Sequence, residues 1–285
     1  MSASAEDLAP LADWIGRSET RTDLVHAAPI AALAALLDHD DAAPQAGDAM
    51  PPLAHWLYFL PVHRESKLGP DGHAARGEFL PPVPLPRRMW AGSRLDFLRP
   101  VAIGETIQCT SRIAAVNVKQ GRSGPLVFVT VRHEISNPSG LAITDEHDIV
   151  YRGESGAAAA PPVPAPAGEA WSRVVHPDPV LLFRYSAVTF NGHRIHYDHP
   201  YATRVEGYPG LVVHGPLVAT LLVDLLRRNR PGVELATFSF RAMRPLFDTA
   251  PFTVCGLPDA TAGTARLWAR DAGGALTMEA VATWR

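Results

Sequence analysis

The sequence has 285 residues, of which 47% are hydrophobic and 19% charged, and its formal net charge at pH 7 is −3. This apolar fraction supports a substantial core and argues against global disorder, and the absence of excess basic charge argues against a nucleic-acid partner. The length suits one large domain or two of ordinary size.

The first half of the chain predicts helical segments followed by a run of strands. Apolar residues recur at helical spacing over 8–15 and 27–37. A short apolar segment at 53–60 precedes a long Gly/Pro-rich loop over about 61–86, and loops of this length often serve as binding elements or lids. Four segments rich in β-branched and aromatic residues then alternate with turn signals and are predicted strands: 89–97, 106–118, 126–136 and 141–151.

A Pro/Ala-rich tract divides the chain. Residues 157–166 read Ala-Ala-Ala-Ala-Pro-Pro-Val-Pro-Ala-Pro and have no apolar periodicity. Such a tract is typical of a semi-extended linker rather than a packed layer. We therefore predict an N-terminal domain over 1–152, a linker over 153–170 and a C-terminal domain over 171–285.

The second half repeats the plan of the first. A strand at 171–176 precedes a histidine-rich segment, and a helix is predicted over about 216–228. Further strands are predicted at 236–243, 252–256, 264–270 and 276–284. A strand that ends in Arg-Pro plus an apolar residue occurs at a similar place in each half. We interpret the chain as an internal duplication of an α+β unit, in which an antiparallel sheet wraps around one helix.

The N-terminal residues and the cysteines favour the cytoplasm. Residues 1–7 lack the apolar segment of a secretory signal and the arginines of a transit peptide. Cys109 and Cys255 lie far apart and suggest no disulfide framework. The longest apolar stretch, 217–226, is interrupted by Asp224 and is too short to cross a bilayer. We expect a cytoplasmic protein without a membrane partner.

The segment 185–198, Tyr-Ser-Ala-Val-Thr-Phe-Asn-Gly-His-Arg-Ile-His-Tyr-Asp, concentrates chemically active side chains. Asn191, His193 and His196 lie within six residues of one another. The tetrapeptide at 214–217, His-Gly-Pro-Leu, then opens the long apolar helix. A proton-transferring cluster beside a helix N-terminus suits the addition of water to an α,β-unsaturated thioester.

The same segment resembles the signature of the MaoC-like (R)-specific enoyl-CoA hydratases and dehydratases. That signature contains an Asp, a His five residues later, and then Asp-Pro and Phe/Tyr-Ala. His196 falls on the signature His, and Asp198 and Tyr201-Ala202 match its tail. The variant present here is most similar to the branch that contains mesaconyl-CoA and itaconyl-CoA hydratases and mitochondrial 3-hydroxyacyl-thioester dehydratases. The resemblance implies a double hotdog fold, two antiparallel sheets each wrapped around a central helix.

The sequence departs from the signature at Asn191, which stands where the family has Asp. An amide cannot accept a proton at neutral pH, so Asn191 can only orient a water or an imidazole, or cap the following turn. His196 is then expected to carry most of the acid–base work. His193 is either a second participant or a structural residue.

Gly215 is the candidate oxyanion donor. We expect it in the N-cap region with Pro216 as the first helical residue, a position that favours proline. Free amide groups and the positive end of the helix dipole lie at such a terminus. A thioester carbonyl seated on the Gly215 amide would be stabilised as it gains negative charge, by about 2.7–4 kcal/mol per donor.

Arginines supply candidate anion-binding groups, because the guanidinium fork binds carboxylates and phosphates bidentately. Arg194 is a candidate for selecting a dicarboxylic acyl group, and Tyr197 in the same motif is a candidate substrate-binding residue. Candidates for CoA phosphates or a substrate carboxylate, unranked by the sequence, are Arg87, Arg88, Arg241 and Arg244.

The sequence therefore predicts a hydro-lyase that reversibly hydrates a short, branched dicarboxylic enoyl-CoA of the mesaconyl-CoA or itaconyl-CoA type. No metal is expected, because the histidines lack paired cysteines or a His-Glu-x-x-His helix, and no other cofactor is expected. The acyl-CoA substrate is the expected partner, and a homo-oligomer remains open. Two alternatives are a hotdog acyl-CoA thioesterase and a non-catalytic acyl-CoA or acyl-carrier binding module.

Overall fold

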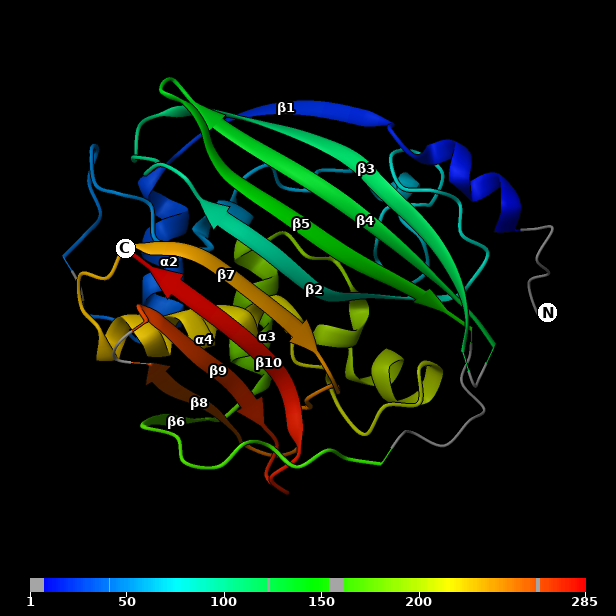
Figure 1. The fold of residues 1–285 in the computed structure, drawn as a ribbon. Helices are drawn as coiled ribbons and strands as arrows, with labels where there is room; N and C mark the ends of the chain where they lie inside the picture. Colours follow the sequence, from blue (N-terminus) through cyan, green and yellow to red (C-terminus); the bar gives the residue numbers. More distant parts are fainter. Residues whose placement is uncertain (1–7, 41, 122–123, 154–160, 260–261) are drawn as a thin grey trace.

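The computed structural model describes residues 8–40, 42–121, 124–153, 161–259 and 262–285. These residues form one curved antiparallel sheet, with helices α2, α3 and α4 on the same side of it (Figure 1). The sheet has ten strands in the order β1-β3-β4-β5-β2-β7-β10-β9-β8-β6 within the described residues. The strand bounds are β1 Ser18–Leu24, β2 Arg87–Phe97, β3 Thr106–Gly121, β4 Gly124–Asn137, β5 Gly140–Arg152, β6 Trp171–Val175, β7 Leu235–Ala242, β8 Phe252–Asp259, β9 Thr264–Arg270 and β10 Leu276–Trp284.

The sheet is built from two five-stranded halves joined edge to edge. Strands β1 to β5 come from the first half of the chain, and β6 to β10 from the second. The join is the antiparallel pair β2·β7, in register from Gly92↔Arg241 to Asp96↔Thr237. This arrangement confirms the α+β double hotdog class, with the two expected sheets continuous across the join. Residues 154–160 of the expected linker lie outside the described residues, so the domain boundary stays a prediction.

The helices fill the concave side. They are α2 Ala27–Leu36, α3 Pro179–Val188 and α4 Gly215–Asn229, and shorter helical turns are η1 Ala9–Trp14, η2 Ala54–Leu57, η3 Glu65–Lys67, η4 Arg194–His196 and the π-helical η5 Tyr201–Val205. Helix α4 is the most buried, because ten consecutive residues from Leu217 to Leu226 are covered. Pro216 in its first turn and Arg227 and Arg228 in its last turn favour these ends. No helix of the described residues is long and apolar enough to cross a membrane.

Two elements escaped the sequence analysis. Strand β1 has no long apolar run, because it lies at the sheet edge and pairs only with β3. Helix α3 lies within the histidine-rich half, and its start is marked by Asp178, whose side chain accepts from the Leu181 amide at 2.8 Å, and by Pro179. The expected helix over 8–15 is largely the 3₁₀ segment η1, a correction of type rather than of place.

A β-bulge in β2 decides which side chains face the helices. Arg88 pairs with Tyr151, which is fully buried against loop residues Val83 and Leu85, so both Arg88 and Tyr151 face the helix side. The register shifts between Trp90 and Gly92. Beyond the bulge the alternation is inverted, and Arg94 projects from the other face.

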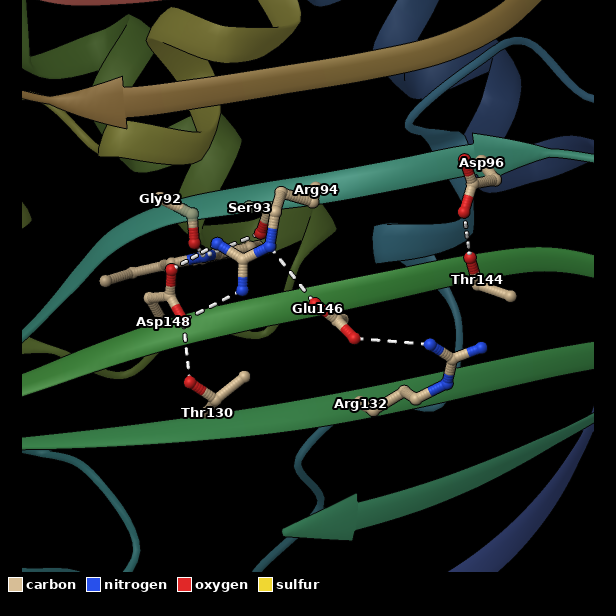
Figure 2. A network of polar contacts seen from close by, with 10 residues as sticks. Gly92, Ser93, Arg94, Asp96, Thr130, Arg132, Thr144, Glu146 and Asp148 are labelled. Carbon is tan, nitrogen blue, oxygen red and sulfur yellow. Dashed lines mark hydrogen bonds and ion pairs between the residues drawn. The ribbon is translucent and has the colours of Figure 1, made fainter. Parts of the chain in front are cut away.

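Figure 2 shows the outer face beyond the bulge. Arg94 reaches Asp148 at 2.6 Å and Glu146 at 3.1 Å on β5, and Glu146 also meets Arg132 on β4 at 3.2 Å. The Arg94 side chain is 52% exposed. Strand β2 thus presents one arginine to the interior and another to this exposed ion-pair network.

Candidate active site

The core of the site is the imidazole of His196, held by the backbone of a neighbouring segment. His196 is 7% exposed, and its Nδ1 donates a hydrogen bond to the Val212 carbonyl oxygen at 2.6 Å. Because a carbonyl only accepts, Nδ1 carries the hydrogen and Nε2 is left with its lone pair. The ring is therefore fixed in the tautomer that a general base requires.

The ring of His214 lies flat on that of His196, with centroids 3.7 Å apart and an interplanar angle of 18°. His214 is in turn hydrogen-bonded through Nε2 to the Ser186 hydroxyl at 2.8 Å. The next residue, Gly215, is the first of α4, and His214 is the N-cap, which moves the expected positions of Gly215 and Pro216 by one. The start of α4 and the His196 ring consequently lie side by side.

His193 completes the group from the C-terminal half. Its ring stands perpendicular to that of His196, with the centroids 5.3 Å apart. Both residues belong to the short turn that follows α3, and the Asn191 side chain shapes this turn by accepting from the His193 amide at 3.0 Å. The expected closeness of His196 to the start of α4 therefore agrees with the geometry, and His193 lies beside His196, while the roles of all three residues stay predictions.

The long loop of the N-terminal half supplies two further groups. The His73 ring lies 4.1 Å from that of His193, centroid to centroid. Asp71 accepts from His73 twice, from the backbone amide and from Nδ1, each at 3.1 Å. The site is thus assembled from both halves of the chain.

Glycine allows this loop to dock on the histidine motif. Gly72 has φ +86°, and a Cβ there would collide with the Gly192 carbonyl, while a Cβ on Gly192 would crowd the Gly72 carbonyl. Beside this contact the Arg194 amide donates to Asp71 O at 2.9 Å, and Arg194 Nη1 donates to Pro70 O at 3.0 Å. Two backbones in direct contact fix His73 against His193.

Burial keeps the imidazoles of the site neutral. Desolvation lowers the pKa of His196 to about 4, partly opposed by its bond to Val212. Desolvation, with the neighbouring His73 and His196, lowers the pKa of His193 to about 2. Burial also places the pKa of His214 well below its ordinary value. At neutral pH these rings carry lone pairs rather than charges.

The charged groups of the site come from the N-terminal half. Burial raises the pKa of Asp71, but its bonds with His73 and the nearby positive charge of Arg88 outweigh this and leave the pKa below the usual range. Burial lowers the pKa of His73, and Arg88 contributes in the same direction. The site therefore combines neutral imidazoles, an ionised carboxylate and a guanidinium.

The remaining predicted residues have other contacts. The Asn191 side chain caps the following turn, and its role in orienting a water or an imidazole stays a prediction. The Tyr197 hydroxyl donates to Gly192 O at 2.8 Å. Arg194 spends Nε and Nη2 on Asp198, at 2.9 and 2.7 Å, and Nη1 on the loop. These contacts hold the Arg194 guanidinium in place, and the substrate-binding roles of Arg194 and Tyr197 stay predictions.

Arg241 of β7 does not join the histidines. Arg241 neighbours Phe240, a buried core residue, and so projects from the opposite, outer face, where its side chain is 69% exposed and 3.8 Å from Glu279. Arg244 follows the end of β7, and its amide donates to Thr277 O at 3.2 Å. Arg87 is held by Glu206, with Nε 3.3 Å from the carboxylate.

One set of donors has the composition of a metal site. Ligand atoms of Asp71, His73 and His193 all lie within 4.8 Å of one another. Two imidazoles and a carboxylate suit a divalent transition metal. The positive charge of Arg88 is close enough to affect the pKa of all three residues, and it opposes the binding of a dication there. The absence of a metal cofactor stays a prediction.

The sequence alone did not indicate a role for Asp71, His73, His214 or Ser186. A usable signal for His214 was its position directly before Gly215 and Pro216. For Asp71 and His73 the only signal was their place in an unusually long loop. Nothing local indicates that this loop meets a motif more than 100 residues away.

Comparison with known proteins gives consistent matches. A family model described as hydroxyacyl-thioester dehydratase type 2 matches residues 53–248. The mesaconyl-C(4)-CoA hydratase of Chloroflexus aurantiacus is 51% identical, over 86% of this chain and 88% of its own. The mitochondrial hydroxyacyl-thioester dehydratase type 2 of Schizosaccharomyces pombe is 29% identical, over 73% of this chain and 77% of its own.

Solved structures share the fold at low sequence identity. A MaoC-like dehydratase superposes with a TM-score of 0.72 at 14% identity, covering 96% of this chain and 99% of its own. HtdX of Mycobacterium tuberculosis gives a TM-score of 0.63 at 21% identity, covering 94% and 100%. A further Mycobacterium tuberculosis protein, described as a double hotdog, gives 0.58 at 14%, covering 95% and 96%.

Proposed function

The chain belongs to the hydroxyacyl-thioester dehydratase type 2 family, and from this premise we propose that it reversibly adds water to the C2–C3 double bond of a short, branched dicarboxylic enoyl-CoA. The relative from Chloroflexus aurantiacus is named for mesaconyl-C4-CoA, which makes this thioester the first substrate to test. In mesaconyl-C4-CoA the second carboxylate is attached to C3, counted from the thioester carbonyl carbon as C1.

The observation that carries the proposal is the stack of His196 on His214 at the start of α4. A conjugated thioester needs a base near C3 and an oxyanion donor near C1. His196 Nε2 supplies the base, and the Gly215 amide supplies the donor. The two lie in adjacent positions because His214 is both the stacking partner of His196 and the neighbour of Gly215.

The reaction then proceeds in balanced steps. The thioester carbonyl docks on the Gly215 N–H. His196 Nε2 takes a proton from water, whose oxygen bonds to C3 as the C2–C3 π electrons move toward the carbonyl. The resulting enolate oxygen is stabilised by the helix terminus. C2 then takes a proton from the imidazolium or through His193, and the catalyst returns to its starting state.

The proposal is tested by mixing the purified protein with mesaconyl-C4-CoA. Loss of the ultraviolet absorbance of the conjugated thioester, with a product heavier by one water and no free thiol, supports hydration. Release of free thiol would instead support the thioesterase alternative. Tight binding of enoyl-CoA esters with no turnover of any of them would support the binding-module alternative.

No metal or redox cofactor enters these steps, so dialysis against a chelator is expected to leave the rate unchanged. A cytoplasmic location stays a prediction of the sequence, which leaves the oligomeric state open.

A further inference from the structure

A substrate with a carboxylate on C3 places a demand on the site, given the proposed function. The carboxylate is one carbon–carbon bond from the atom that water attacks. Its binding partner must therefore adjoin the imidazoles that activate the water. An arginine elsewhere on the surface cannot meet this requirement.

Three of the candidate arginines, and Arg76 of the long loop, are engaged in other contacts. Arg194 has committed all three guanidinium nitrogens to Asp198 and to Pro70 O. Arg87 is held by Glu206, and Arg241 lies on the outer face of the sheet. Arg76 donates to the carbonyls of the loop segment that it spans, at 2.6 Å to Val83 and 2.7 Å to Pro86.

Arg88 has the required position. Its pairing with the buried Tyr151, before the bulge in β2, turns it toward the helix side of the sheet. Trp90 lies on the same face of the same strand. Its carbonyl oxygen is close to Gly215, because a Cβ built on Gly215 would be 3.8 Å from it. Arg88 thus lies on the strand that passes the start of α4, two residues before Trp90.

The electrostatics agree with this placement. The positive charge of Arg88 acts on the pKa of Asp71, of His73 and of His193, which agrees with a guanidinium near these three residues. Among the described residues no carboxylate lies within ion-pairing distance of Arg88, and both oxygens of Asp71 accept from His73. A half-buried guanidinium that forms no ion pair favours the arrival of an anion.

We propose that Arg88 forms a carboxylate-binding subsite beside His73 and His193, which selects acyl-CoA substrates that carry a second carboxylate on C3. The guanidinium fork holds the carboxylate bidentately. It thereby offsets the negative charge next to the attacked carbon. The N-terminal half contributes specificity in this way, and the C-terminal half contributes the base and the oxyanion donor.

The test uses two saturated esters that do not react, so it is independent of turnover. Succinyl-CoA and butyryl-CoA have the same chain, except that a carboxylate replaces the terminal methyl group. Isothermal titration should show that the native protein binds succinyl-CoA at least about tenfold more tightly. In Arg88→Gln this preference should disappear, while the affinity for butyryl-CoA changes less than about threefold.

The matched control is Arg94→Gln, the same substitution on the outer face of the same strand (Figure 2). It should keep the native preference for succinyl-CoA. If Arg88→Gln fails to fold, Arg88→Lys keeps the charge without the fork and should retain only part of the preference.

Three results would overturn the subsite. They are a native protein without preference, a preference that survives in Arg88→Gln, and an equal loss of affinity for both esters, which would place Arg88 on the CoA moiety. None of these bears on whether the native protein hydrates mesaconyl-C4-CoA. The subsite and the proposed reaction therefore fail separately.

Discussion

Two clusters of histidines lie on the helix side of this sheet, and they differ in which nitrogen of the imidazole ring is hydrogen-bonded. In the N-terminal half, Oδ2 of Asp145 accepts from His147 Nε2 at 2.7 Å, Trp56 Nε1 at 2.9 Å and His55 Nε2 at 3.1 Å. In the C-terminal half, His196 donates to a backbone carbonyl and stacks on His214. The partner of the ring, rather than its burial, separates the two clusters.

In the first cluster the carboxylate of Asp145 engages the Nε2 atom of both imidazoles. Asp145 is fully buried, and although burial raises its pKa, the charges and bonds of His147 and His55 outweigh this and hold the pKa below its usual range. Each of these imidazoles spends Nε2 on the carboxylate. His196 spends only Nδ1, and its Nε2 remains available for a proton. We interpret the Asp145 cluster as structural and the His196 cluster as catalytic.

The two clusters are neighbours, so a substitution in one cluster could disturb the other. The Trp90 ring lies 4.0 Å from that of His147, and the Trp90 carbonyl adjoins Gly215. Substitutions in the His196 cluster should nevertheless lower kcat, whereas substitutions in the Asp145 cluster should lower the free energy of unfolding.

The largest effect is expected for His196→Ala. Loss of the general base should lower kcat by about 10²–10⁴ for hydration of mesaconyl-C4-CoA. Steady-state rates measured at pH 7.5 check this expectation. His196→Asn is the matched variant, because its amide nitrogen can replace the Nδ1–H donor to Val212 but nothing replaces Nε2. It should recover stability without recovering kcat, and turnover near the native level in either variant would end the assignment.

Asp145→Asn should act on stability instead. Because the folded-state pKa of Asp145 is lowered, the ionised carboxylate stabilises the fold above the pKa of the unfolded chain, and this contribution is lost as pH falls. Removing the charge from three buried donors should cost about 3–5 kcal/mol in the free energy of unfolding at pH 7. Urea denaturation measures this change, and kcat of the folded enzyme should vary less than about threefold.

The matched control is Asp148→Asn, on the outer face of the same strand (Figure 2). Its exposed ion pair with Arg94 should contribute less than about 1 kcal/mol. A large loss of kcat with an unchanged unfolding free energy in Asp145→Asn would reverse the roles assigned to the two clusters.

The smallest effect expected concerns pH. Desolvation lowers the pKa of His196 from 6.5 to about 4, so the base stays neutral as pH falls through 6.5. We expect kcat/KM to be level down to about pH 5 and to fall tenfold per pH unit below the pKa of the free enzyme. The buried neutral ring also makes stability fall as pH drops from 6.5 toward 4, because unfolding releases a ring that then binds a proton. Short rate measurements with circular dichroism as a check on folding separate the two effects, and an acid limb near pH 6.5 would contradict the burial argument.

Much of this protein follows from local sequence. Hydrophobic periodicity and turn residues place most strands and helices α2 and α4 within a few positions, because these signals depend on neighbours along the chain. The motif at 191–196 and the Gly215-Pro216 helix start likewise indicate the candidate catalytic segment. The weakly apolar edge strand β1 and the capped helix α3 lack a strong local pattern and were missed.

The tertiary structure decided what the two halves do together. The contact of Gly72 with Gly192 brings Asp71 and His73 to the histidines, and no local pattern encodes a meeting of segments so far apart in the chain. The bulge after Trp90 sends Arg88 inward and Arg94 outward, although simple alternation from 88 to 94 would put both on one face. Sequence spacing fixes which side chains are available, but long-range backbone contacts and register shifts determine which of them share a site.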